Sequence, residues 1–131
     1  MLRPSRRLLR LFPLALLLAL SSCAGRLLSR AREAECVGAH YEAERLYKEL
    51  YKSTPTKERQ RRALYSLHAA EAAYRGRRYA MARALLQRAQ RLHLPDSLLH
   101  RSKLYTTLST EALRAEDSSP HGLYEVERFD R

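Results

Sequence analysis

The sparse placement of glycine and proline constrains the fold of this chain most strongly. Beyond residue 26, glycine and proline occur only at Gly38, Gly76, Gly122, Pro55, Pro95 and Pro120. Both residues interrupt helices, and the segments between them consist mostly of alanine, leucine, arginine, glutamate, lysine and glutamine, which favour the helix. No segment alternates apolar and polar residues with a period of two. The sequence therefore predicts an all-α fold.

Five helices of ordinary length fit between these breaks. We expect them over residues 27–37, 40–52, 54–74 and 78–92, and from residue 95 onward. The second and fourth carry apolar residues at the i, i+3, i+4, i+7 spacing of a buried helix face. These residues are Ala43, Leu46, Tyr47 and Leu50 in one helix and Ala82, Leu85, Leu86 and Ala89 in the other.

The connections contain residues typical of helix ends. Thr54 is expected to cap the third helix, with Pro55 in its first turn. Pro95 and Asp96 are expected to open the fifth helix. That helix should turn one apolar face inward, formed by Leu98, Tyr105, Leu108 and Ala112.

The first 22 residues have the three parts of a secretory signal. Met1 to Arg10 contains four arginines and no acidic residue, Leu11 to Leu20 is apolar except for Pro13, and two small serines follow. The apolar run is shorter than the roughly 20 residues that span a bilayer. An ordinary signal with a chance cysteine after it, or an uncleaved anchor, are the alternatives.

The four residues Leu20-Ser21-Ser22-Cys23 resemble the lipobox of bacterial lipoproteins. The resemblance implies cleavage between Ser22 and Cys23 and acylation of Cys23. Because no aspartate follows the cysteine, it also implies an outer-membrane location, and the lack of an acidic run favours the periplasmic face. The expected domains are a signal peptide at 1–22, a lipidated N-terminus at 23–25, a helical domain at 26–115 and a flexible tail at 116–131.

The basic composition narrows the class of partner. Without residues 1–22 the chain has 21 basic and 14 acidic residues, a net charge of +7 with histidine neutral. An exported basic domain is expected to meet anionic lipid, acidic polysaccharide or an acidic protein rather than nucleic acid. A merely arginine-rich surface, or a cytosolic nucleic-acid binder whose N-terminus mimics a signal, are the alternatives.

No motif for catalysis, cofactors or metals is present. The histidines are isolated or separated by Pro95, which does not match metal-ligand spacing. The neighbouring acids Glu42, Glu44 and Glu49 are expected on solvated helix faces. Cys36, which has no disulfide partner if Cys23 is acylated, is expected to be a small buried side chain. We therefore expect a protein that is not an enzyme.

Two segments of the chain resemble each other. Gly38, Ala43 and Tyr47 are followed by Gly76, Ala82 and Leu86 in a similar order, and Ala43 and Ala82 are 39 residues apart. The pattern resembles the tetratricopeptide repeat, a helix–turn–helix unit of about 34 residues. The matching positions are Ala43, Tyr47 and Pro55, then Ala70, Tyr74, Tyr79, Ala82, Leu86 and Ala89.

The resemblance implies about five antiparallel helices forming two degenerate hairpins plus a capping helix, and a plain helical bundle is the alternative. Residues 41–63 also look like the N-terminal repeat segment of Bacteroidetes outer-membrane lipoproteins of the OmpA family and of type IX secretion. A more distant likeness is to the repeat lipoprotein of the β-barrel assembly machinery.

These resemblances imply a protein–protein interaction or scaffold module in the cell envelope, in secretion or outer-membrane assembly. An envelope-structural lipoprotein that binds peptidoglycan or anionic lipid is the alternative. In tetratricopeptide proteins the first helix of each pair lines the partner-binding surface. By that resemblance Arg59, Arg62 and Tyr65 are expected to contact a partner, since arginine and aromatic residues often anchor interfaces. An ordinary solvated helix face is the other interpretation.

Overall fold

The computed structural model describes residue 16 and residues 23–118, and it confirms the all-α prediction. One helix covers residues 23–36 and is followed by α2 (His40–Ser53), α3 (Arg59–Arg75), α4 (Tyr79–Arg91) and α5 (Asp96–Asp117). Helix α5 extends two residues beyond the predicted domain end at 115. Apart from residue 16, the predicted signal with its cleavage site at Ser22 lies outside the described residues, as does the tail from residue 119.

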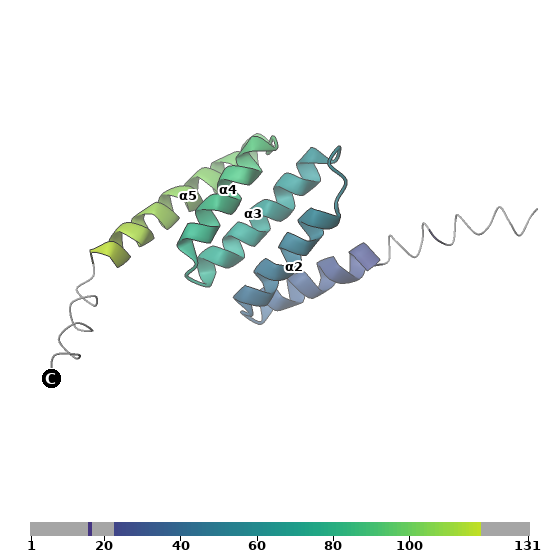
Figure 1. The fold of residues 1–131 in the computed structure, drawn as a ribbon, viewed down its shortest axis with the longest axis horizontal. Helices are drawn as coiled ribbons and strands as arrows, with labels where there is room; N and C mark the ends of the chain where they lie inside the picture. The colour runs from purple at the N-terminus through teal and green to yellow at the C-terminus, as the bar shows by residue number, and fades with distance from the viewer. Residues whose placement is uncertain (1–15, 17–22, 119–131) are drawn as a thin grey trace, which may run out of the picture.

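The helices form a stack of hairpins in which α2 packs on α3, α3 on α4 and α4 on α5. Figure 1 shows that the start of the first helix, the α2–α3 connection and the α4–α5 connection lie along one edge of this stack. We call it the Cys23 edge. The turns after the first helix and after α3 lie along the other edge with the end of α5, and we call it the opposite edge.

The core is built from small side chains with a few large ones between them. Alanines of all four helices between residues 23 and 91 are buried, and the large side chains Leu46, Tyr47, Leu50, Leu67 and Leu86 fill the remaining space. Small residues let neighbouring helices approach closely, and bulky ones then fill the grooves beside them. The many buried alanines therefore explain how these helices pack closely although each has few large apolar side chains.

The stack has an internal repeat of 39 residues. Six positions are buried in the first hairpin, and the residues 39 positions later are buried in the second. They are Ala31, Ala34, Ala43, Leu46, Tyr47 and Leu50, which correspond to Ala70, Ala73, Ala82, Leu85, Leu86 and Ala89. The two hairpins are therefore the same packing unit used twice.

The turns of the two hairpins correct one detail of the predicted alignment. Gly38 has φ 74° and Arg77 has φ 61°, so Arg77 and not Gly76 is the counterpart of Gly38. In each turn the next amide donates to a carbonyl five residues earlier, Ala39 to Ala34 and Arg78 to Ala73, both at 2.8 Å. Both helices thus end in a Schellman motif with a left-handed residue.

Gly76 has a different reason to be glycine. Its φ is −79°, which any residue can adopt. A Cβ at this position would lie 3.3 Å from the Cβ of His40, at the start of α2. Gly76 therefore allows the end of α3 to approach α2 closely.

Thr54 ends α2 and does not begin α3, so the predicted cap is wrong. Its hydroxyl donates to the carbonyl of Leu50 at 2.7 Å, and its amide donates to the same oxygen at 3.1 Å. Thr54 is in an extended conformation, as the residue before a proline usually is. Residues 55–58 form a turn and α3 begins at Arg59.

Two predictions of exposure are also wrong. Cys36 is exposed. Glu44, expected on a solvated face, is only 1% exposed, and its carboxylate accepts a hydrogen bond of 2.7 Å from Arg78 Nη1. Lys48 Nζ lies 3.5 Å from its other oxygen. Glu44 is covered because Arg78, next to the start of α4, reaches across to α2.

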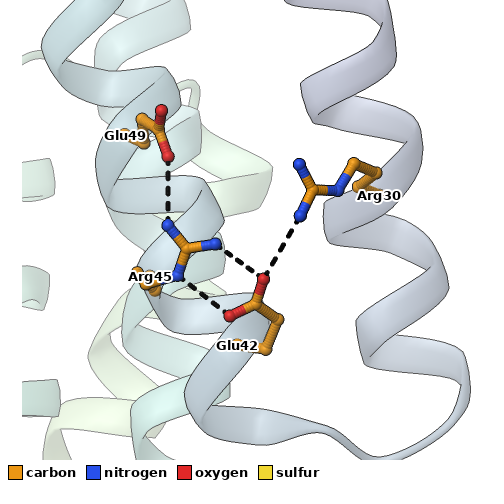
Figure 2. A network of polar contacts seen from close by, with 4 residues as sticks. All are labelled: Arg30, Glu42, Arg45 and Glu49. Atoms are coloured by element: carbon orange, nitrogen blue, oxygen red, sulfur yellow. Dashed lines mark hydrogen bonds and ion pairs between the residues drawn. The ribbon is translucent and has the colours of Figure 1, made fainter.

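The first hairpin is also joined by an exposed ion-pair network on its surface (Figure 2). Glu42 of α2 lies 3.6 Å from Arg30 of the first helix and 2.7 Å from Arg45, which also lies 3.4 Å from Glu49. Water and salt screen exposed pairs of this kind, so each contributes little to stability. The network therefore favours the register of the hairpin more than it stabilises the fold.

Candidate functional site

Helix α5 occupies the place of a first helix in a third hairpin. The 39-residue offset places Ser102 and Ser109 of α5 at the positions of the buried alanines Ala63 and Ala70 of α3. Ser102 and Ser109 are fully buried. Helix α5 packs on α4, and Ser102 Oγ accepts a 2.7 Å hydrogen bond from Gln90 of α4, so α5 lies where the first helix of a third hairpin is expected.

Positions of α3 that face α4 have equivalents on α5, 39 residues later, and those equivalents have no following helix among the described elements. Ser66 Oγ donates to the carbonyl of Leu85 in α4 at 2.8 Å, and Ala69 and Ala73 are buried beside it. The same positions on α5 are Tyr105, Leu108 and Ala112. No helix follows α5 within the described range. Tyr105 packs against Tyr74 of α3, with ring centroids 5.4 Å apart, whereas Leu108 is exposed.

The uncovered side of α5 exposes two large apolar residues one helical turn apart. Leu104 is 57% exposed and Leu108 is 38% exposed. Leu108 was expected to face inward, and it lies outward because the helix that would cover it is not among the described elements. We call Leu104, Leu108 and Ala112 the open face of α5. Covering a leucine side chain completely contributes roughly 1.5–3 kcal/mol, so this face favours an apolar partner.

The three residues predicted to bind a partner lie in the first half of α3 and differ in exposure, and their contact with a partner stays a prediction. Arg59 is exposed, and its Nη2 donates to the carbonyl of Arg91 at the end of α4 at 3.3 Å. Arg62 is partly buried. Tyr65 is also partly buried and packs against the hydrophobic core.

Arg62 belongs to a cationic cluster that the sequence did not indicate. The guanidinium carbons of Arg62 and Arg88 lie 4.2 Å and 3.6 Å from the ring centroid of Tyr51. The three residues come from α3, α4 and α2, so no spacing along the chain relates them. We call Tyr51, Arg62 and Arg88 the arginine–tyrosine cluster.

The charge of this cluster is not neutralised by carboxylates in the described part of the chain, where neither guanidinium lies within 4.0 Å of one. Arg88 Nε donates to Ser66 Oγ at 3.1 Å, whereas Arg88 Nη2 and Arg62 Nε are buried without a hydrogen-bond partner. Burial lowers the pKa of the Arg88 guanidinium, and the nearby charge of Arg62 acts in the same direction. The cluster is therefore a place of positive potential.

A second polar network links helices on the side of Glu71. Glu71 is buried, and one of its oxygens accepts a 2.6 Å hydrogen bond from Arg101 of α5. Burial raises the pKa of the Glu71 carboxyl, and Arg101 partly opposes that shift. The ion pair between Arg101 and Glu71 therefore connects α5 to α3.

The same region contains a stacked histidine. The Tyr47 hydroxyl donates to Glu35 at 2.8 Å, and the Tyr47 ring stacks on His68 with centroids 5.0 Å apart. Burial lowers the pKa of His68, and burial together with the Glu35 hydrogen bond raises the pKa of Tyr47. These contacts join the first helix, α2 and α3, which gives the network a structural role.

The predicted lipidation residue lies at the Cys23 edge. Cys23 is exposed in the helix over residues 23–36. None of the helices in the described range combines the length and the apolar character needed to cross a bilayer. Among the described residues no three histidine, cysteine, aspartate or glutamate side chains are placed to hold a metal ion.

Comparison with protein-family models, with curated proteins and with solved structures finds no match for this chain. A function therefore has to be supported by the chain's own residues. The repeat could have identified α5 as the first helix of a third hairpin, because Ser102 and Ser109 follow Ala63 and Ala70 by 39 residues. Which residues of α5 are uncovered depends on its neighbours in the fold. The arginine–tyrosine cluster offered no such signal.

Proposed function

We propose that this chain is a lipid-anchored, tetratricopeptide-like scaffold protein of the bacterial outer membrane that binds a partner protein in the envelope. Its role belongs to secretion or outer-membrane assembly. The observation that carries the proposal is the open face of α5 at the end of a repeating stack of hairpins. A repeat array that ends with an apolar side uncovered favours the addition of another element.

The occupant of the open face is an amphipathic helix of the partner. On the equivalent side of α3 lies α4, which contributes the small residue Ala82 and the large residues Leu85 and Leu86. A partner helix with that pattern would cover Leu104 and Leu108 in the same way, as helix-in-groove recognition does. Apolar anchors would then supply most of the binding energy.

The sequence after α5 does not carry the pattern of α4. A further offset of 39 residues would place Glu125 and Arg128 at the positions of the buried residues Tyr47 and Leu50. Charged residues at two core positions would be costly to bury without partners. Residues 119–131 therefore do not repeat the pattern of α4, and in this proposal the covering helix comes from a second protein.

The membrane attachment in this proposal is acylation of Cys23. It is supported by the lipobox-like residues Leu20 to Cys23, by the basic and apolar leader, and by the exposure of Cys23. A single acyl chain holds a protein to a membrane only marginally, so the stable anchor requires more than one chain on this residue.

Affinity purification from detergent-solubilised envelopes tests the partner. The double variant Leu104→Gln/Leu108→Gln should lose the proteins recovered with the wild-type chain, and quantitative mass spectrometry measures that loss. The matched control is Val37→Gln/Tyr41→Gln, which changes two exposed apolar residues at the opposite edge. Equal recovery by all three proteins, or no specific partner for the wild type, would count against the proposal.

A second candidate is an envelope-structural lipoprotein that binds peptidoglycan or anionic lipid. The observation that favours it is the arginine–tyrosine cluster, whose two guanidinium groups have no carboxylate partner among the described residues. Co-sedimentation with purified sacculi tests it. Binding that weakens with salt, and weakens further in Arg62→Gln, would support this candidate, whereas salt-independent binding would oppose it.

A further inference from the structure

The basic residues of the stack gather at the Cys23 edge. Dividing each helix at its midpoint assigns residues 23–29, 47–67 and 85–106 to this edge and residues 30–46, 68–84 and 107–118 to the opposite edge. The Cys23 edge then holds eleven basic and three acidic residues, a net charge of +8. The opposite edge holds eight of each and has no net charge.

Local pairing makes this asymmetry larger. Of the eleven basic side chains at the Cys23 edge, only Lys48, Arg61 and Arg101 lie within 4.0 Å of a carboxylate of the described residues. At the opposite edge five of the eight have such a partner, namely Arg30, Arg45, Arg75, Arg78 and Arg114. Most of the positive charge at the Cys23 edge is thus available to an external anion.

Most of the unpaired cations are also accessible. Six of them are exposed, namely Arg26, Lys52, Lys57, Arg59, Arg91 and Lys103. They come from the first helix, the α2–α3 region and the α4–α5 region, which Figure 1 shows side by side along one edge. The charges therefore form a band that crosses the whole stack and not a patch on one helix.

The predicted anchor residue, Cys23, lies at the same edge and is joined to the core by a short, continuous helical segment. The helix that includes Cys23 continues without interruption to Ala31, which is fully buried in the core. Eight residues of helix span about 12 Å. Acyl chains on Cys23 would hold the Cys23 edge close to the lipid headgroups, where charges interact over a Debye length of about 8 Å.

We infer that the Cys23 edge docks on the membrane surface by binding anionic phospholipid headgroups, so that the acylated domain stands on this edge with a fixed orientation. The inference rests on the acylation of Cys23 in the proposed function. Basic residues near an anionic bilayer add to the affinity of an acyl anchor. The opposite edge, with no net charge, points away from the membrane, and the open face of α5 stays accessible from the side.

The four lysines of the chain provide the readout, because all of them lie in the Cys23-edge half, at Lys48, Lys52, Lys57 and Lys103. The mature acylated protein is purified from membranes and reconstituted into vesicles of phosphatidylcholine alone, or of equal parts phosphatidylcholine and phosphatidylglycerol. A membrane-impermeant amine reagent is applied at low conversion, and mass spectrometry measures the labelling of each lysine. We expect several-fold slower labelling on the anionic vesicles, reversed by high salt.

Carboxyl labelling and charge variants control this measurement. Labelling of Glu116 and Asp117, at the opposite edge, should be the same on both vesicles. Lys52→Glu/Lys57→Glu should weaken the protection of Lys48 and Lys103, whereas Arg32→Glu/Arg114→Glu, with the same change in charge at the opposite edge, should preserve it. Equal lysine labelling on the two vesicles, or protection that salt does not reverse, would overturn the inference.

The intact mass of the purified protein separates the two possible failures. Acylated protein whose lysines are labelled equally on both vesicles refutes membrane docking and leaves the anchor in place. Protein without acyl groups on Cys23 refutes the anchor in the proposed function, and the docking inference fails with it.

Discussion

Arg77 adopts the left-handed backbone conformation that Gly38 adopts 39 residues earlier, with φ 61° against 74°. A side chain in this conformation is strained by its Cβ, at a cost of about 1 kcal/mol or more, whereas glycine is not. The second hairpin therefore carries strain that the first hairpin avoids.

Replacing Arg77 by glycine should raise the free energy of unfolding by about 1 kcal/mol, because it removes this strain at a helix C-terminus. Denaturant unfolding measures the change. Arg75→Gly, at the last residue of α3, is the control and should lower stability, because it removes the ion pairs of Arg75 with Glu35 and Glu71. Loss of stability in both variants would show that Arg77 is not strained.

Replacing Ser109 by alanine should increase the stability of the fold. Its hydroxyl is fully buried without a hydrogen-bond partner, and the repeat places alanine at the equivalent positions Ala31 and Ala70. Ser109→Ala removes an unsatisfied buried group, so we expect a gain of about 1–2 kcal/mol in unfolding free energy.

Ser102 provides the opposite expectation on the same helix. Its Oγ accepts a 2.7 Å hydrogen bond from Gln90 Nε2. Ser102→Ala should cost about 1 kcal/mol because the Gln90 amide loses its shorter partner. Thermal unfolding of both variants measures the difference, and a stabilising Ser102→Ala would contradict this account of the α4–α5 contact.

His68 should make stability fall in mild acid. Burial holds the pKa of His68 below its ordinary value of 6.5, so the unfolded chain binds a proton that the folded protein resists. The contribution is complete above pH 6.5 and is lost as pH falls from 6.5 through the folded-state pKa. His68→Phe keeps the stacking on Tyr47 and should flatten this decline.

Denaturant unfolding at a series of pH values measures the decline. His100→Gln, at an exposed position of α5, is the control and should leave the profile unchanged. A His68→Phe profile that matches the wild-type profile would show that another group causes the acid sensitivity.

Tyr51 should contribute to stability through its two arginine contacts. Cation–π contacts of partly buried residues contribute about 1 kcal/mol, so Tyr51→Leu should destabilise the fold by about that amount and Tyr51→Phe by less. Tyr41→Leu is the matched control, because Tyr41 is exposed and its ring centroid is 5.4 Å from the Arg78 guanidinium. Equal effects at the two positions would argue against a stabilising arginine–tyrosine cluster.

Local sequence was sufficient to predict the five helices and most of the core of the first two hairpins. Helix propensity, breaks at Gly38 and Pro95, and the spacing of Ala43, Leu46 and Leu50 are properties of a few neighbouring residues. Interactions between residues close together in the sequence determine these features. For that reason the second and fourth helices differ from their predicted ranges by one residue at most at either end.

Functional surfaces were harder to predict from sequence. The sequence did not indicate that Arg62 packs on Tyr51 beside Arg88, and its contact with a partner stays a prediction. Leu108 was expected inside but is 38% exposed. Whether a side chain is free or covered depends on which helix lies next to it, and periodicity along one helix does not contain that information.

The sequence by itself determined an all-α chain with a 39-residue repeat, because alanine-rich helices and their breaks arise from local energetics. Only the tertiary structure decided that Glu44 is buried under Arg78, that α5 has an open face, and that the basic residues share one edge. The physical reason is that antiparallel packing brings the start of the first helix, the α2–α3 connection and the α4–α5 connection to the same edge of the stack, although they are far apart in the chain.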